Sequence, residues 1–259
     1  MPPTRRLLAY VGIGLVAGFL SGLFGVGGGI LIVPALVLLL GFPQKVATGT
    51  SLLAIAPISL VGVASYAAHG AVDWVMGAVL AVGMVAGGVL GSWLLARLPP
   101  LVVTWVFIAA LVAVAIRLML VEPERGLPHP VGWLEVVLLL ALGVVTGVLS
   151  GLVGVGGGVV IVPALVVLGG VSDVLAKGVS LLAMVPNAVV TSVLNLRRRN
   201  ADLAAGLAIG LSGCATTVLG AFAAVWIDAR IGAILFGVFL LGVAVQLAVR
   251  AVRRSRGSG

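Results

Sequence analysis

The amino-acid sequence predicts an all-α, polytopic membrane protein with two homologous halves. Of its 259 residues, 62% are hydrophobic and 8% are charged, whereas a soluble domain carries about 25% charged residues. The charged residues divide the chain into eight uncharged runs, each about as long as the roughly 20 residues that a helix needs to cross a bilayer. These runs are 7–44, 46–72, 74–96, 98–116, 136–172, 178–196, 203–227 and 231–249. We therefore expect about eight transmembrane helices, or up to ten if the two longest runs each cross twice.

A long segment of the chain occurs twice at an offset of 129 residues. LSGLFGVGGGILIVPAL (Leu20–Leu36) aligns without gaps on LSGLVGVGGGVVIVPAL (Leu149–Leu165), and the same offset aligns ATGTSLLAIAP with AKGVSLLAMVP. Such internal duplication is typical of transporter folds. We expect an N-terminal transmembrane repeat over 1–121, a polar linker EPERGLPHP over 122–130, and a C-terminal transmembrane repeat with a basic tail over 131–259.

The two longest runs, 7–44 and 136–172, each contain the glycine motif GVGGG and a proline after it. A continuous helix of that length would extend about 55 Å at 1.5 Å per residue, nearly twice the thickness of the hydrocarbon core. Each consecutive glycine weakens a helix by about 1 kcal/mol relative to alanine. We therefore expect two helical pieces in each run, separated by a glycine loop at membrane depth, with the second piece starting at Ile30 or Val159.

The distribution of Lys and Arg predicts the orientation. With eight or with ten spans, eleven of these residues collect on the side of both termini and four on the other side. The positive-inside rule then places both termini in the cytoplasm and the chain in the cell membrane. With eight spans the four are Lys45, Arg97, Lys177 and Arg230, and with ten they are Arg117, Arg125, Lys177 and Arg230. Four spans per half would make the repeats parallel and five would make them inverted, and charge leaves both open.

Composition argues against several other functions. The net charge of +8 follows from the positive-inside bias, so we expect no nucleic-acid partner. A single cysteine, Cys214, and two histidines, His69 and His129, offer too few ligands for a disulfide framework or a metal centre. The chain has no Gly-x-Ser-x-Gly elbow, P-loop lysine or HExxH motif. We expect neither an enzyme nor a bound cofactor or metal.

The two glycine loops are the strongest candidates for a functional site. Irregular backbone is tolerated at membrane depth only where protein or a water-filled cavity satisfies it, so the loops imply a cavity. Their N–H groups and the positive ends of the helices that follow could together bind an anion. The candidate substrate-binding residues are Gly25, Gly27, Gly28, Gly29, Gly154, Gly156, Gly157 and Gly158 in the loops, with Ser21, Thr50, Ser51, Ser150, Ser180 and Asn187 near them.

These candidates also have structural interpretations. The loop glycines could simply let helices pack closely, which is the interpretation we adopt for Gly83, Gly87 and Gly91. The Ser and Thr hydroxyls could bond the carbonyl four residues earlier. Asp73 and Asp202 are expected to be helix N-caps. The charged residues at run boundaries, Asp173 and Lys177 among them, are expected to reach the membrane interface.

The duplicated GLFGVGGGILIVPAL and GLVGVGGGVVIVPAL, with the ATGTSLLAIAP and AKGVSLLAMVP that follow, resemble the TauE/SafE family of prokaryotic and plant membrane proteins, often called sulfite or organosulfonate exporters. The resemblance extends from about Leu7 to Arg250. It implies transport of small anions such as sulfite, sulfoacetate and related organosulfur or carboxylate compounds. The second repeat departs from the first at Thr48/Lys177 and Thr50/Val179.

We therefore expect a secondary transporter, most simply an exporter, that binds a small anion between the two glycine loops. The bilayer is its other partner, and a coupling proton or ion and the oligomeric state are left open. Two alternatives remain. An anion channel would use the same loops as a selectivity filter, and a non-transporting membrane scaffold would leave them inert.

Overall fold

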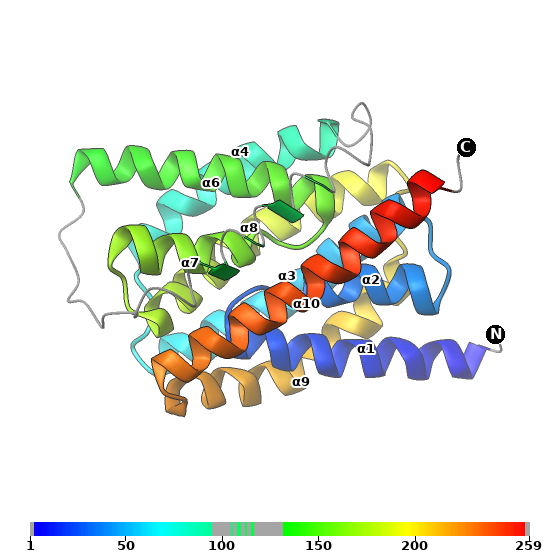
Figure 1. Cartoon of the computed structure of the whole chain (residues 1–259), viewed down its shortest axis with the longest axis horizontal. Coiled ribbons are helices and arrows are strands. Elements are labelled where there is room, and N and C mark those ends of the chain that lie inside the picture. The colour runs from blue at the N-terminus through cyan, green and yellow to red at the C-terminus, as the bar shows by residue number, and fades with distance from the viewer. Residues whose placement is uncertain are drawn as a thin grey trace.

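The protein is described here by a computed structural model that covers residues 3–94, positions 105, 108, 109, 112, 115 and 116, and residues 132–256. Within these ranges it is all-helical, as predicted (Figure 1). The helices are α1 (Pro3–Phe24), α2 (Gly29–Leu39), α3 (Gln44–Ala68), α4 (Trp74–Leu94), α6 (Trp133–Val153), α7 (Gly158–Gly169), α8 (Asp173–Arg197), α9 (Leu203–Trp226) and α10 (Ala229–Arg256). The predicted linker 122–130 lies outside the described residues.

Seven of the described helices are long and apolar enough to cross a membrane, and α2 and α7 are shorter apolar helices. Each short helix follows a glycine loop, so both long runs are divided into two helical pieces as the glycines predict. The second pieces begin at Gly29 and Gly158, one residue before the expected starts.

Helix α2 runs back along α1. A Cβ built at Gly28 would lie 2.7 Å from the carbonyl oxygen of Ala17, so the chain has already turned back toward the middle of α1. Beyond α2, the Phe42 ring packs edge-on against the ring of Tyr10, with centroids 6.4 Å apart. Helix α2 therefore ends at the end of the bundle where α1 begins (Figure 1). Each glycine loop is the tip of a helical hairpin, as in the ten-span alternative.

The two halves have opposite orientations. Helices α3 and α8 are equivalent at the offset of 129, and they pack antiparallel to each other. Gly49 near the start of α3 contacts the backbone of Asn200 just after α8, whereas Gly178 near the start of α8 contacts the backbone of Ala71 just after α3. Figure 1 also shows α1 and α6 beginning at opposite ends of the bundle. The repeats are inverted, which decides the alternative that the charge distribution left open.

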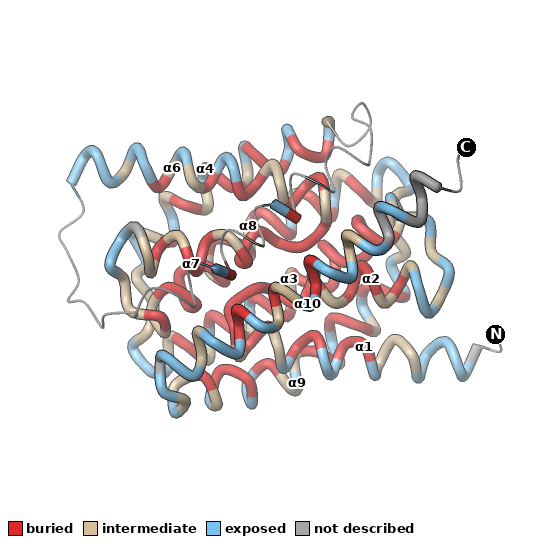
Figure 2. Tube along the Cα trace, in the orientation of Figure 1, coloured by how far each residue is buried: buried red, intermediate tan, exposed pale blue. Residues whose placement is uncertain are grey.

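The centre of the bundle is formed by α3 and α8 (Figure 2). The most apolar stretch of α3 is 72% buried, against 44% for the corresponding stretches of α1 and α4. The outer pairs α1 with α9 and α4 with α6 pack through glycines whose Cα atoms face the partner backbone. These glycines are Gly14, Gly18 and Gly22 on α1, and Gly83, Gly87 and Gly91 on α4. The close-packing interpretation of the α4 glycines is thus confirmed.

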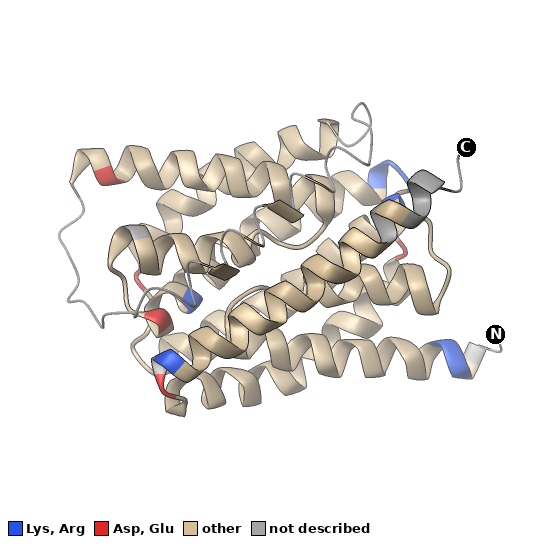
Figure 3. Ribbon diagram, in the orientation of Figure 1, with Lys and Arg blue, Asp and Glu red and all other residues tan. Residues whose placement is uncertain are grey.

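The charged residues lie mainly toward the two ends of the bundle (Figure 3). Helices α4 and α9 begin with the two predicted N-caps, since Asp73 accepts from the Met76 N–H and Asp202 from the Ala205 N–H, each at 2.9 Å. Asp173 and Lys177, in the first turns of α8, are only 8% and 6% exposed. Their side chains are buried and pair with each other.

The glycine contacts between α1 and α9 predict a position-specific effect on stability. Gly18→Ala should lower the free energy of unfolding by about 1–3 kcal/mol, because its Cβ would collide with the Gly213 carbonyl. The control is Gly12→Ala on the same helix, where a Cβ would meet no described atom within 4 Å. Thermal unfolding in detergent measures both variants, and equal midpoints would contradict the packing interpretation.

Candidate functional site

The loops that precede α2 and α7 have a backbone that favours glycine. Gly25, Gly27 and Gly28 have φ values of 69°, 75° and 74°. The equivalent Gly154, Gly156 and Gly157 have φ values of 79°, 89° and 86°. Residues with a side chain rarely adopt this left-handed region. The duplicated glycine motif therefore encodes a duplicated reversal of the chain.

The two loops are held by serines from the opposite half. The Ser51 hydroxyl of α3 donates to the Gly154 carbonyl at 2.8 Å, and the Ser180 hydroxyl of α8 donates to the Gly25 carbonyl at 2.9 Å. The two bonds are equivalent at the offset of 129. Each serine hydroxyl therefore donates to a loop carbonyl of the other half. It does not bond the carbonyl four residues earlier in its own helix.

The loops also touch each other. A Cβ built at Gly29 would lie 2.6 Å from the Gly154 carbonyl oxygen, and one built at Gly158 would lie 2.5 Å from that of Gly25. Any side chain at Gly29 or Gly158 would push the loops apart. The candidate glycines of both halves are therefore brought together at the repeat interface.

The amide groups of the loops are buried without acceptors. In the first loop the N–H groups of residues 26–30 make no hydrogen bond with any described residue, and the first bonded amide after them is that of Leu31. In the second loop the same holds for residues 155–159, before Val160. All these residues are buried. Because unpaired buried N–H groups are rare and costly, this is an unusual concentration of free donors.

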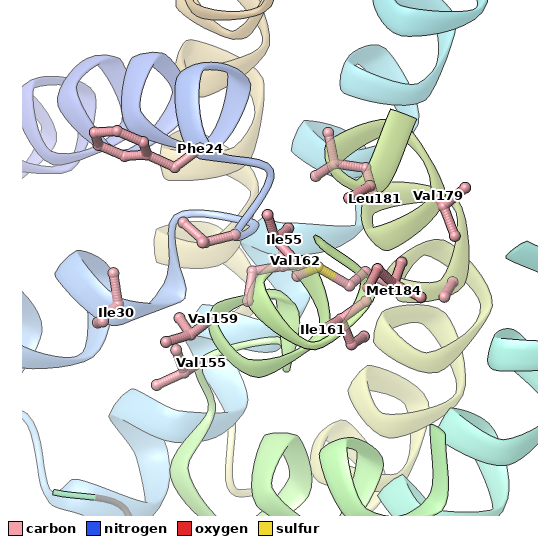
Figure 4. Packing of buried hydrophobic residues seen from close by; sticks show 14 of the residues in the cluster. Phe24, Ile30, Ile55, Val155, Val159, Ile161, Val162, Val179, Leu181 and Met184 are labelled. Atoms are coloured by element: carbon pink, nitrogen blue, oxygen red, sulfur yellow. The ribbon is translucent and has the colours of Figure 1, made fainter. Parts of the chain in front are cut away.

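Two apolar side chains lie between the loops, where the sequence predicts a cavity. Methyl groups added at Gly27 and Gly156 would both collide with the terminal methyl of Met184 on α8. Ile55 of α3, which is equivalent to Met184, also contacts both glycines. Figure 4 shows Ile55 and Met184 near the centre of the buried cluster.

Two apolar cavities lie away from the loop glycines. One of about 690 Å³ lies between α1, α2 and α10, with Ile13, Pro34 and Phe239 among its lining residues. The other, of about 550 Å³, lies between α3, α4 and α8 and includes Leu60 and Pro186. Their linings are almost entirely apolar, and the first includes Ile30, directly after the first glycine loop.

The remaining candidate side chains divide into two groups. Ser150 accepts a hydrogen bond from the Asn187 Nδ2 at 3.1 Å, while the Asn187 Oδ1 and the Ser21 hydroxyl are buried without a partner among the described residues. Thr50 instead accepts from the Asp202 N–H at 2.9 Å, at the start of α9. The structure therefore does not bring Thr50 to the pair of loops.

Sequence analysis missed Ile55, Met184 and the buried position of Lys177. Met184 and Ile55 read as ordinary apolar helix residues, and nothing in their spacing marks them as contacts of both loops. Lys177 had a signal, since it departs from Thr48 at the equivalent position. Its stem packs against Gly25 as Thr48 packs against Gly154. Among the described residues no group of His, Cys, Asp and Glu could hold a metal ion.

Comparison with known proteins agrees with this architecture of two hairpin-tipped repeats. A family model described as "Sulfite exporter TauE/SafE" matches residues 2–118 and 138–258, one segment in each half. The chain belongs to the TauE/SafE family. No experimentally solved structure matches it with significance.

Several curated relatives in this family are named as probable membrane transporters. The chain is 46% identical over 93 residues to the "Probable membrane transporter protein YunE" of Bacillus subtilis, which is 35% of this chain and 34% of that protein. It is 30% identical over 159 residues to MJ0441 of Methanocaldococcus jannaschii, or 59% of each chain. The aligned part thus spans about a third to three fifths of these relatives. The TauE/SafE assignment makes this chain a multi-pass membrane protein of a transporter family.

The crossed serine bonds predict a stability difference between two serines of α3. Ser51→Ala should cost about 1–3 kcal/mol of unfolding free energy, because it leaves the Gly154 carbonyl buried without a donor. Ser59→Ala should be neutral or stabilising, because the buried Ser59 hydroxyl has no partner among the described residues. The measurement is the unfolding midpoint in detergent, and a larger loss for Ser59→Ala would contradict the assigned bond.

Proposed function

We propose that this chain is a secondary transporter that exports a small anion such as sulfite, sulfoacetate or a related organosulfur or carboxylate compound. One observation carries the proposal: the amide groups of residues 26–30 and 155–159, in two buried loops that meet at the repeat interface, have no acceptors among the described residues. An oxyanion supplies several acceptors in a small volume. Membership of the TauE/SafE family supports the same class of substrate.

The loops can attract an anion without a buried arginine. Helices α2 and α7 begin directly after Gly28 and Gly157, and neither has a side-chain cap. The positive end of each helix dipole and the free N–H groups therefore act together on the same region. Ser51 and Ser180 hold the loops in place, and Asn187, Ser150 and Ser21 are the polar groups that would orient the substrate oxygens.

Transport requires the closed site to open alternately to the two sides. Inverted repeats supply this property, because exchanging the conformations of the two halves converts one open state into the other. In the closed arrangement Ile55 and Met184 fill the space between the loops, so they must move aside for the anion to reach the amides. The process involves no covalent step, and we therefore assign no catalytic residue.

The direction follows from the orientation that we propose. Arg5, Arg6 and Arg197–Arg199 lie at the end of the bundle that holds both termini, while Lys177 and Arg230 lie toward the opposite end (Figure 3). The positive-inside rule then makes the end with the termini cytoplasmic in the cell membrane. A negative membrane potential drives anions outward, which favours export.

Substitution of the loop glycines should abolish transport. We expect the double variant Gly28→Ala, Gly157→Ala to lose at least about 90% of its flux, because both positions have positive φ and lie against backbone of α1 or α6. The matched control is Gly41→Ala, Gly170→Ala, which is equivalent at the offset of 129, also has positive φ, and has open space around it.

The measurement is flux of labelled sulfite, sulfate, thiosulfate, sulfoacetate, taurine, acetate and lactate in proteoliposomes, per amount of folded protein. Saturable flux and counterflow distinguish a transporter from a channel. Equal flux in the loop variant and its control would contradict the site. If the wild type moves no anion of this panel under either a proton gradient or a membrane potential, the proposed function is wrong.

Met184 should influence which anion is accepted. Met184→Ala vacates the space between Gly27 and Gly156, so transport of sulfoacetate relative to sulfite should rise about tenfold in kcat/KM, the scale of one or two methylene groups in an apolar site. Met184→Ile, which copies Ile55 of the first half, is the control and should keep the wild-type ratio. An unchanged ratio in Met184→Ala would exclude Met184 from the substrate path.

A further inference from the structure

An ion pair lies inside the bundle beside the first glycine loop. The Lys177 Nζ is 3.2 Å from the Asp173 Oδ2, and the two side chains are only 7% and 11% exposed. The stem of Lys177 packs against Gly25, and its Nζ lies near Gly232 at the start of α10. The pair lies in the first turns of α8, which begins next to the end of α3, at the end of the bundle opposite the chain termini.

This pair is incompletely satisfied. The Asp173 Oδ1 is buried without a hydrogen-bond partner among the described residues. The ammonium can donate three hydrogen bonds, and Asp173 is its one acceptor in the described part of the chain. Tyr66 of α3 lies within electrostatic range of Asp173, but its hydroxyl donates to the Gly22 carbonyl at 2.6 Å. The ammonium therefore has unused capacity to bind an anion.

The first half has no such pair. At the equivalent positions of the first half stand Gln44 and Thr48, which are uncharged. Thr48 nevertheless packs against Gly154 as Lys177 packs against Gly25. Charged side chains buried inside a helical membrane bundle are costly and commonly mark ion or substrate pathways. The uncharged half makes the same loop contact, so that contact does not account for the charge at Lys177.

We propose that the Lys177 ammonium is a second binding position for the small anion, and that the Asp173 carboxylate occupies it when no anion is bound. This inference rests on the proposed function. An arriving oxyanion accepts a hydrogen bond from the Lys177 Nζ in place of the Asp173 Oδ2. The stem of Lys177 packs against Gly25 while its Nζ lies near Gly232, so the second position lies on the α10 side of the first loop. The position belongs to one half only, so the two sides of the membrane have unequal affinities.

A purely structural role makes a different prediction. In that case the pair stabilises the first turn of α8, as pairs at positions i and i+4 do, and breaking it from either side has the same effect. If Asp173 instead competes with the anion, Asp173→Asn must tighten anion binding while Lys177→Thr weakens it. The opposite signs distinguish the two roles.

The test measures two constants. One is the concentration of sulfite or sulfoacetate that gives half of the maximal rise in unfolding temperature in detergent, and the other is the KM of transport in proteoliposomes. We expect about a tenfold decrease for Asp173→Asn and about a tenfold increase for Lys177→Thr, the scale of one charge-assisted hydrogen bond. Lys45→Thr, at an exposed lysine on α3, should leave both constants unchanged. Because a lone buried lysine could prevent folding, the double variant Asp173→Gln, Lys177→Thr recreates the pair Gln44 and Thr48, and it should raise KM about tenfold while keeping the unfolding midpoint.

Each outcome decides between the two proposals. If both constants change in the same direction in Asp173→Asn and Lys177→Thr, the second binding position is wrong and the loop site stands. The same conclusion follows if the wild type is active and the double variant keeps the wild-type KM. A wild type that neither binds nor moves any anion overturns the proposed function and the second position together.

Discussion

A peptide group that leaves helical geometry inside a bilayer loses its hydrogen-bond partner and finds no water to replace it. This chain interrupts its helices twice at that depth. Ser51 and Ser180 repair part of the cost, because each donates to a loop carbonyl of the other half. Each loop also bonds within its own repeat, as the Gly25 N–H does to the Ser21 carbonyl, but the carbonyls of Gly25 and Gly154 depend on the other half. The architecture of the bundle follows from this mutual dependence.

The same constraint explains why the repeats meet at their loops. Glycine permits the reversal at each hairpin tip, and it also lets the loops approach until Gly29 faces the Gly154 carbonyl. Backbone can come this close only where no Cβ intervenes. The outer pairs α1 with α9 and α4 with α6 use the same property, since their glycines face partner backbone. Close backbone packing therefore takes the place of large apolar side chains at these glycine contacts.

The inverted symmetry is geometrical and is not matched by the chemistry of the residues. Ile55 and Met184 take equivalent places beside the loops, yet one is branched and stiff and the other is flexible. Thr48 and Lys177 differ by a full charge. A transporter with two identical halves would treat both sides of the membrane alike. These differences make the two halves chemically unequal although their helices are arranged in the same way.

The sequence by itself determined the membrane class, the duplication, the broken helices and the N-caps at Asp73 and Asp202, because hydropathy, glycine and capping act over a few neighbouring residues. It also identified the loops that meet at the interface. Only the tertiary structure decided that the repeats are inverted, that Ile55 and Met184 close the space between the loops, and that Lys177 is buried. These features depend on which distant segments pack together, and local sequence patterns do not specify that.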